Sequence, residues 1–165
     1  MIEQFHDEHF FLSNMKPLTF MVLTNRNTWA LTSEHAYQAA KFADPAVHHQ
    51  VAHMTAEKRG LEEEYDGIAA KNFAHELIDA GEPLRPNWGE PMKLAVMEEV
   101  VKRKFIANPD LRDMLIATGD EELVEGNTWG DQYWGVDPVG SNNGENHLGL
   151  ILMRVREKLA RQLVS

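Results

Sequence analysis

The stretch Thr32-Ser33-Glu34-His35-Ala36-Tyr37-Gln38-Ala39-Ala40-Lys41-Phe42 is the part of the sequence around which the rest of the chain is organised. Thr32 and Ser33 are favourable N-cap residues. Glu34 follows them in the first turn, where the dipole of a helix favours negative charge. The stretch therefore predicts a helix that begins at these residues.

Helical spacing divides this stretch into two sides. At 3.6 residues per turn, Glu34, Tyr37, Gln38 and Lys41 fall on one stripe. The opposite side carries small apolar residues that let another helix approach closely: Ala36, Ala39, Ala40 and Ala43. A carboxylate, an amide and an amine on one stripe form a candidate site. The alternative is that Glu34 only complements the helix dipole and that Glu34 and Lys41 are ordinary surface charges.

Length and composition limit the class of protein to which the chain can belong. The chain has 165 residues, of which 43% are hydrophobic and 25% charged, so we expect residues 1–165 to form one compact domain. The absence of cysteine excludes a disulfide framework and a thiolate nucleophile. Neither a membrane-spanning run nor a signal peptide is present, which favours a cytoplasmic protein. The net charge of −10 argues against a broad phosphate-binding surface, so a nucleic acid is expected only as a substrate, through one local pocket.

The remaining pattern predicts an α+β fold that is mostly helical, with a small β-hairpin near its N-terminus. Residues 18–23 and 28–31 are the two expected strands, joined by a turn at 25–27. Helices are expected to start at Pro45 and Pro91, to run over 65–80 and 111–117, and to close the chain after Asn146. The acidic run 62–64 is expected to lie in solvent ahead of the helix over 65–80.

Two groups of basic residues are ambiguous. His49 and His53 are four residues apart, as in a metal-binding pair, but no partner stands at a zinc spacing, so we expect no metal or other cofactor. Lys93 and Lys104 are expected to project almost in line along one helix. They either extend along the apolar stripe to reach solvent, or form a cationic wall for a phosphate.

Three loops carry further candidates. In the irregular segment 81–89, Trp88 is either a core anchor or, next to Arg85, a platform on which a flat ligand stacks. Residues 123–135 hold two Trp, one Tyr and two acidic residues, which is unusual outside a functional site. The Gly- and Asn-rich loop over 137–146 either holds an anion on its backbone N–H groups or is a plain connection.

The order of these motifs resembles that of the NADAR family over nearly the whole chain. Each motif is weak alone, and the ordered set is specific. The motifs are Phe11-Leu12-Ser13-Asn14, Ser33-Glu34-His35-Ala36-Tyr37-Gln38-Ala39-Ala40-Lys41, Arg85-Pro86-Asn87-Trp88, Lys104-Phe105, Leu123-Val124-Glu125, Asp131, Trp134-Gly135, Asn146-His147-Leu148-Gly149, Leu152-Met153 and Arg156.

The resemblance implies hydrolysis of the N-glycosidic bond of a ribosylated substrate. Members are associated with early phosphorylated riboflavin-pathway intermediates, and others with removal of ADP-ribose from guanine bases. The resemblance places Glu34, Lys41 and Asp131 in the catalytic site and Trp88 in the substrate site. Other motif residues expected to bind substrate are Asn14, Tyr37, Gln38, Arg85, Trp134 and Asn146.

The expected chemistry explains these residue types. Breaking a ribosyl C–N bond develops positive charge at the anomeric carbon. A carboxylate near that carbon either stabilises the charge or activates a water molecule. Trp88 suits a planar leaving group, and Lys41 either donates to the sugar or attacks its opened aldehyde. A module that only binds ADP-ribose or a nucleotide is the alternative from another class, although binding alone would not need Glu34, Lys41 and Asp131 together.

Overall fold

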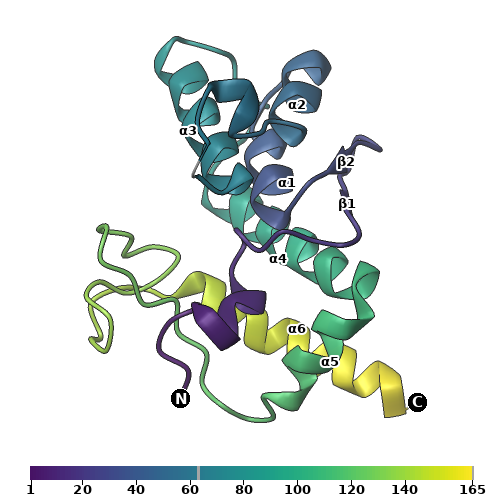
Figure 1. Cartoon of the computed structure of the whole chain (residues 1–165), viewed down its shortest axis with the longest axis vertical. Coiled ribbons are helices and arrows are strands. Elements are labelled where there is room, and N and C mark those ends of the chain that lie inside the picture. Colours follow the sequence, from purple (N-terminus) through teal and green to yellow (C-terminus); the bar gives the residue numbers. More distant parts are fainter. Residues whose placement is uncertain (63, 165) are drawn as a thin grey trace. The chain divides into compact units, whose positions relative to one another are not determined.

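The computed structural model of the chain describes residues 1–62 and 64–164 (Figure 1). Glu63, within the acidic run expected ahead of the third helix, lies outside the described residues. The chain forms two compact units, one made of residues 14–108 and the other of 1–13 with 109–165. The fold is mostly helical with one two-stranded sheet, which confirms the expected α+β class. A single domain over residues 1–165 stays a prediction.

The first strands of the 14–108 unit form a short antiparallel hairpin. Strand β1 (Val22–Leu23) pairs with β2 (Trp29–Ala30), with Val22 opposite Ala30 and Leu23 opposite Trp29. In the turn, the Thr24 hydroxyl accepts hydrogen bonds from the backbone N–H groups of Arg26 and Thr28. The hairpin is thus where the sequence predicts it.

Both strands are shorter than expected, for a reason outside the hairpin. The backbone N–H of Phe20 donates to Asn108 Oδ1 and its carbonyl accepts from Asn108 Nδ2, each at 3.0 Å. A side chain at the end of a helix therefore takes the hydrogen bonds that a longer strand would offer to its neighbour. On the other strand, the Leu31 N–H donates to the carbonyl of Ala52 at 3.2 Å.

Helix α1 (Ser33–Ala40) lies between α2 (Pro45–Ala52), α3 (Asp66–Asp79) and α4 (Glu90–Ala107) (Figure 1). The expected N-cap is present, since the Thr32 side chain accepts a hydrogen bond from the His35 N–H at 3.2 Å. Because helices pack around it, every residue of α1 is buried. Burial of Glu34 excludes the reading of this residue as an ordinary surface charge.

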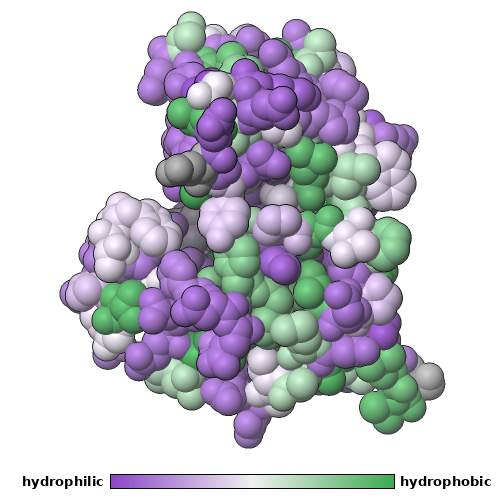
Figure 2. Space-filling view, in the orientation of Figure 1, coloured by the Kyte–Doolittle hydropathy of each residue, from purple (hydrophilic) through white to green (hydrophobic). Residues whose placement is uncertain are grey.

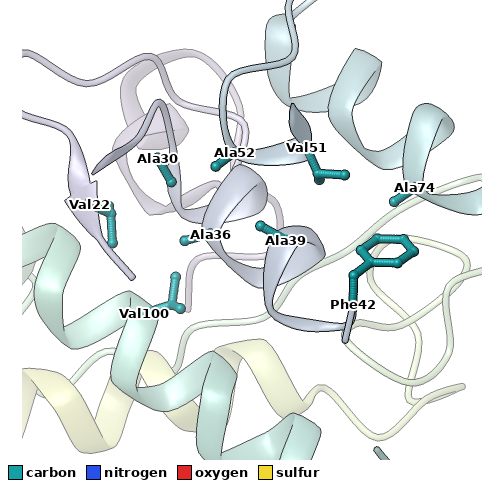
Figure 3. Close-up of a cluster of buried hydrophobic side chains, with 9 residues drawn as sticks. All are labelled: Val22, Ala30, Ala36, Ala39, Phe42, Val51, Ala52, Ala74 and Val100. Carbon is teal, nitrogen blue, oxygen red and sulfur yellow. The ribbon is translucent and has the colours of Figure 1, made fainter. Parts of the chain in front are cut away.

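Small residues build the core on the alanine side of α1, as Figure 3 shows. Ala36 and Ala39 point into a cluster to which the hairpin, α2, α3 and α4 each contribute. The other members of this cluster are Val22, Ala30, Phe42, Val51, Ala52, Ala74 and Val100. Since an alanine methyl fills little volume, the neighbouring helices come close to the α1 backbone and hold it firmly.

The helices after α1 follow their local signals. A short 3₁₀ turn, η2 (Glu57–Arg59), follows α2 and is closed by Gly60 in a left-handed conformation, φ 77°. Gly81, φ 93°, follows α3 as expected for a C′ glycine. Pro91 is the second residue of α4, as its fixed φ angle favours.

The pair Lys93 and Lys104 does not form the cationic wall considered from the sequence. Lys93 is half-buried in the first turn of α4, whereas Lys104 is 1% exposed. The Lys104 ammonium lies 4.9 Å from the centroid of the Phe105 ring. The two lysines therefore share a direction along α4 but differ in their exposure to solvent.

The other unit combines a 3₁₀ helix, η1 (Asp7–Leu12), with α5 (Pro109–Ala117) and α6 (His147–Val164). Parallel bridges join Ile2 to Leu123 and Gly126 to Val136. The apolar stripe expected for the last helix is buried throughout, at Leu148, Ile151, Leu152, Val155 and Leu159.

The last residues of α6 expose hydrophobic side chains to solvent. Leu163 is 57% exposed and Val164 is 88% exposed, and Figure 2 shows the hydrophobic side chains at this end of the helix. Among the described residues, no helix combines the length and the apolar character needed to cross a membrane.

Candidate functional site

Glu34 and Gln38 form the centre of the candidate site. The Gln38 amide donates a hydrogen bond of 2.8 Å from Nε2 to Glu34 Oε1. The exposed fractions of the two side chains are only 7% and 3%. The bond joins residues four apart on α1, so the helix itself sets its geometry. The one side-chain oxygen of Gln38, Oε1, is buried and, among the described residues, has no hydrogen-bond partner, which leaves an acceptor for a ligand.

Asn14 and Ser33 hold the first turn of α1 in place. The Ser33 hydroxyl donates to Asn14 Oδ1 at 2.9 Å, and the Glu34 N–H donates to the carbonyl of Asn14 at 3.2 Å. The Asn14 amide contacts Met97 Sδ of α4 at 3.4 Å. The candidate Asn14 thus connects three segments beside the Glu34 carboxylate, and these contacts fix where that carboxylate lies.

Lys41, at the end of α1, has an unusual electrostatic environment. Burial lowers the pKa of Lys41 to about 8, against the opposing attraction of Glu34, and repulsion from Lys71 and Lys93 adds to the lowering. The Lys41 ammonium lies 5.2 Å from the centroid of the Tyr37 ring. At neutral pH roughly a tenth of such a group is the neutral amine, so Lys41 can act either as a hydrogen-bond donor or as a nucleophile.

An aromatic pair lies next to this lysine. The rings of Tyr37 and Trp88 are tilted by 55°, with centroids 5.8 Å apart. Trp88 is half-buried, so part of its ring is accessible to a ligand. The loop 81–89 is fixed to the end of α1, because Phe42 bridges to Leu84 and the Arg85 N–H donates to the Lys41 carbonyl at 2.8 Å.

In the other unit, Asn127 organises the loop that carries Asp131. The buried Asn127 amide donates to the carbonyls of Asp131 and Val136 and accepts from the N–H groups of Trp129 and Asp131. Asp131 Oδ1 in turn accepts from the N–H of Trp134 at 2.9 Å and from that of Tyr133 at 3.1 Å. Asp131 therefore has a fixed direction in spite of lying in a loop.

Asn146 and Trp134 have well-defined surroundings in the same unit. The Asn146 amide accepts from the Glu125 N–H at 2.9 Å and donates to the Leu123 carbonyl at 3.0 Å. Trp134 meets the Tyr133 ring edge to face, with centroids 4.9 Å apart. Asn146 thus holds the chain where it enters α6, and a part for it in substrate binding stays a prediction.

The structure brings together the candidate residues of the 14–108 unit. Glu34 and Gln38 are hydrogen-bonded, Lys41 is beside Tyr37, and Tyr37 contacts Trp88. The remaining two of this unit, Asn14 and Arg85, are joined to the start and the end of α1. Asp131, Trp134 and Asn146 belong to the other unit and form their own group.

Sequence reasoning missed three residues that contact or influence the candidate residues of this unit. Gly67 packs so closely that a Cβ there would lie 2.8 Å from Met15 Sδ and 3.5 Å from Glu34 Cβ. Lys71 acts on the pKa of Lys41, and Met97 contacts Asn14. A glycine within a helical pattern is a weak signal of close packing, whereas nothing in the pattern distinguished Lys71 from a surface lysine.

The histidines have structural surroundings. His35 Nε2 bonds to the carbonyl of Met54 at 2.7 Å, and His48 bonds to Thr24 and to the carbonyl of Ala39. The rings of His49 and His53 meet edge to face, with centroids 4.3 Å apart. Across residues 1–62 and 64–164, no three His, Asp or Glu side chains come together as a metal site would require. Independence from metal stays a prediction.

A family model and two similar proteins named as N-glycosidases agree with one another. The family model of the NADAR domain matches residues 2–160. N-glycosidase YbiA of Shigella flexneri is 37% identical over 134 residues, covering 81% of this chain and 72% of that protein. An N-glycosidase of Nostoc punctiforme is 37% identical over 144 residues, covering 85% and 80%.

Two further relatives extend the comparison. A riboflavin biosynthesis protein of Vibrio vulnificus is 35% identical over 155 residues, which are 93% of this chain and 36% of that protein. The NMR structure of the Escherichia coli protein YbiA matches with a TM-score of 0.71 and 29% identity, covering 100% of this chain and 90% of that chain. The chain therefore belongs to the NADAR domain family and is a hydrolase of N-glycosyl compounds.

Proposed function

We propose that this protein hydrolyses the C–N glycosidic bond of a phosphoribosyl compound, namely an early phosphorylated intermediate of riboflavin synthesis. The observation that carries the proposal is the buried Glu34 carboxylate, oriented by Gln38 on the stripe that ends at Lys41. The relative named for riboflavin biosynthesis supports the substrate class, because its similarity extends over 93% of this chain.

Glu34 has the properties that this reaction requires. In the transition state the C–N bond lengthens, its electron pair moves to the departing nitrogen, and the anomeric carbon becomes positively charged. A carboxylate that is already oriented and shielded from water stabilises this charge without having to reorganise. A water molecule then forms the new C–O bond, and the departing nitrogen takes up a proton.

The aromatic pair and Lys41 complete the proposed arrangement. The planar base stacks on the accessible part of Trp88, which Tyr37 supports from the side. Lys41 donates to the hydroxyl groups of the ribose, or forms an imine with the aldehyde if the sugar opens. Both roles agree with a lysine whose pKa is about 8, since each protonation state is then populated near neutral pH.

A panel of ribosylated compounds tests this function. The purified protein is incubated with phosphorylated ribosylaminopyrimidines, with their dephosphorylated forms and with an ADP-ribosylated guanine nucleotide. Mass spectrometry then detects the released base or, from the guanine compound, the released nucleotide, and Glu34→Gln serves as the control protein. Release from the phosphorylated pyrimidines alone supports the proposal. Release of ADP-ribose and the intact guanine nucleotide alone would reassign the enzyme to ADP-ribose removal, and no release from any compound would overturn the proposal.

A further inference from the structure

Three lysines from three helices gather around the candidate site, in a chain whose net charge is −10. They are Lys41 at the end of α1, Lys71 on α3 and Lys93 on α4. An excess of negative charge disfavours the binding of anions in general. A local group of ammonium ions therefore indicates a specific anion site rather than a basic surface.

The position of Lys71 follows from the way α3 packs along α1. The first turns of the two helices meet where a Cβ added to Gly67 would lie 3.5 Å from Glu34 Cβ. Further along, Ala39, Phe42 and Ala74 belong to the same buried cluster (Figure 3). Lys71 is one turn beyond Gly67 on the same side of α3. On this side of α3, Lys71 is close enough to Lys41 for the two positive charges to repel each other.

The position of Lys93 follows from contacts on either side of it in the sequence. Before Lys93, the Trp88 ring contacts Tyr37, with centroids 5.8 Å apart. After it, Met97 Sδ contacts the Asn14 amide at 3.4 Å. Lys93 is one turn before Met97 on the same side of α4 and is half-buried. The segment that carries Lys93 is thus attached on one side of the lysine to α1, through Tyr37, and on the other side to Asn14.

The charges of these groups act on one another. Repulsion from Lys71 and Lys93 contributes to the lowered pKa of Lys41, and repulsion from Lys41 and Lys71 adds to burial in lowering the pKa of His75. In the part of the chain that the structure describes, no carboxylate comes within 4.0 Å of the Lys41 or Lys71 ammonium. A bound dianion would relieve this repulsion and accept hydrogen bonds from the ammonium groups.

We propose that Lys71 and Lys93 bind the phosphoryl group of the substrate and so place its glycosidic bond at Glu34. The inference rests on the proposed function and names the residues that recognise the phosphorylated end of the sugar. Each lysine offers N–H donors and a positive charge, which suits the oxygens of a phosphate. A second source of the same chemistry is the diphosphate of an ADP-ribosyl group, and the test includes both.

The activity test compares a phosphorylated ribosylaminopyrimidine with its dephosphorylated form. We expect Lys71→Gln and Lys93→Gln each to lower the ratio of kcat/KM for the two compounds by about tenfold, the usual effect of losing one charge-assisted hydrogen bond. Lys102→Gln is the matched control, because Lys102 lies nine residues beyond Lys93, on the opposite face of α4, near Glu99. An unchanged ratio in both variants would overturn the inference and leave the proposed function intact.

A binding test without turnover separates the two proposals. Calorimetric titration with ribose 5-phosphate, ADP-ribose and inorganic phosphate is repeated on the wild type, on both variants and on Lys102→Gln. Weaker binding of ribose 5-phosphate to both variants, with Lys102→Gln like the wild type, supports the inference even if no compound of the panel is hydrolysed. Weaker binding of ADP-ribose alone would overturn the assignment to a ribose phosphate. Thermal melts of each variant confirm that the fold is retained.

Discussion

Helix α1 and the loop over residues 123–146 both carry candidate residues, and they use polar side chains in different ways. On α1, Asn14 and Thr32 accept from the first-turn N–H groups of Glu34 and His35, and the side chains of Glu34 and Gln38 bond to each other. In the loop, the amides of Asn127 and Asn146 bond to backbone groups that no regular element satisfies. The difference teaches that a helix can present its polar groups to a ligand, whereas a loop first needs several of them for its own shape.

This comparison predicts different consequences for substitutions in the two regions. Polar residues on α1 are expected to affect the rate of the reaction more than folding. Asparagines of the loop are expected to affect folding first, because their removal leaves buried backbone groups without partners.

The largest effect is expected for Glu34→Gln. The substitution keeps the shape of the side chain and an oxygen that accepts the Gln38 hydrogen bond, but it removes the negative charge. Loss of one positioned carboxylate typically lowers the rate by about 10²–10⁴-fold. Steady-state kinetics on the phosphorylated substrate measure the effect, and a thermal melt shows whether the fold is kept. Turnover close to that of the wild type would refute the assignment of Glu34.

Next in size is the expected loss of stability in Asn127→Ala. The variant removes an amide that makes hydrogen bonds with the backbone of Trp129, Asp131 and Val136. We therefore expect the free energy of unfolding to fall by about 2–4 kcal/mol. Urea unfolding followed by circular dichroism measures this change. Asn142→Ala is the control, because Asn142 is exposed in the same loop and should change stability by less than about 0.5 kcal/mol.

Asp131→Asn sharpens the comparison from within the loop. The new side chain keeps an Oδ1 acceptor for the N–H groups of Tyr133 and Trp134 and removes only the charge. We expect an unchanged melting temperature and a fall in kcat/KM of about 10²-fold, because the resemblance places this carboxylate in the catalytic site. If neither activity nor stability changes, the charge of Asp131 has no part in the reaction.

Trp88→Ala is expected to act on binding more than on folding. Trp88 is half-buried, so its removal should cost less than the about 3–5 kcal/mol typical of a large core residue. Loss of a stacking platform should weaken substrate binding by about 10–100-fold. A thermal melt and a binding titration on the same variant separate the two effects. A collapsed melting temperature with intact affinity in the remaining folded protein would identify Trp88 as a core anchor.

The smallest effect concerns Lys41 and pH. The folded state lowers the pKa of this lysine to about 8 from its usual value near 10.5, so the charged form is disfavoured by folding. The loss of folding stability caused by burying the charged amine is complete below pH 8. It becomes smaller as the pH rises toward 10.5, because the unfolded chain then binds more protons than the folded one. The wild type should therefore gain stability relative to Lys41→Met between these pH values. Urea unfolding at several pH values would show parallel curves if Lys41 is not buried in solution.

Lys41→Arg examines the chemical role of the same residue. Arginine keeps the positive charge and the ability to donate hydrogen bonds, but it cannot form an imine with an aldehyde. Full activity of the variant would exclude an essential covalent step. Borohydride added during turnover, followed by measurement of the intact protein mass, would trap an imine in the wild type if one forms.

Local signals in the sequence were sufficient for most element boundaries. Thr32 caps α1, Pro91 lies in the first turn of α4 and Gly81 follows α3, all as predicted. These signals work because a cap, a fixed φ angle or a left-handed glycine acts within one turn of the chain. The hairpin was also predicted, but its length was not, because Asn108 bonds to Phe20 from far along the sequence.

The sequence by itself thus determined the helical elements, the grouping of Glu34, Gln38 and Lys41 on one stripe, and the family to which the chain belongs. Only the tertiary structure decided which charged residues are buried. Lys104 is buried and Lys93 is half-buried although both lie on α4. Lys71, on another helix, contributes to the lowered pKa of Lys41. The physical reason is that burial and electrostatic coupling depend on which helices pack together, and no local pattern of residues records that.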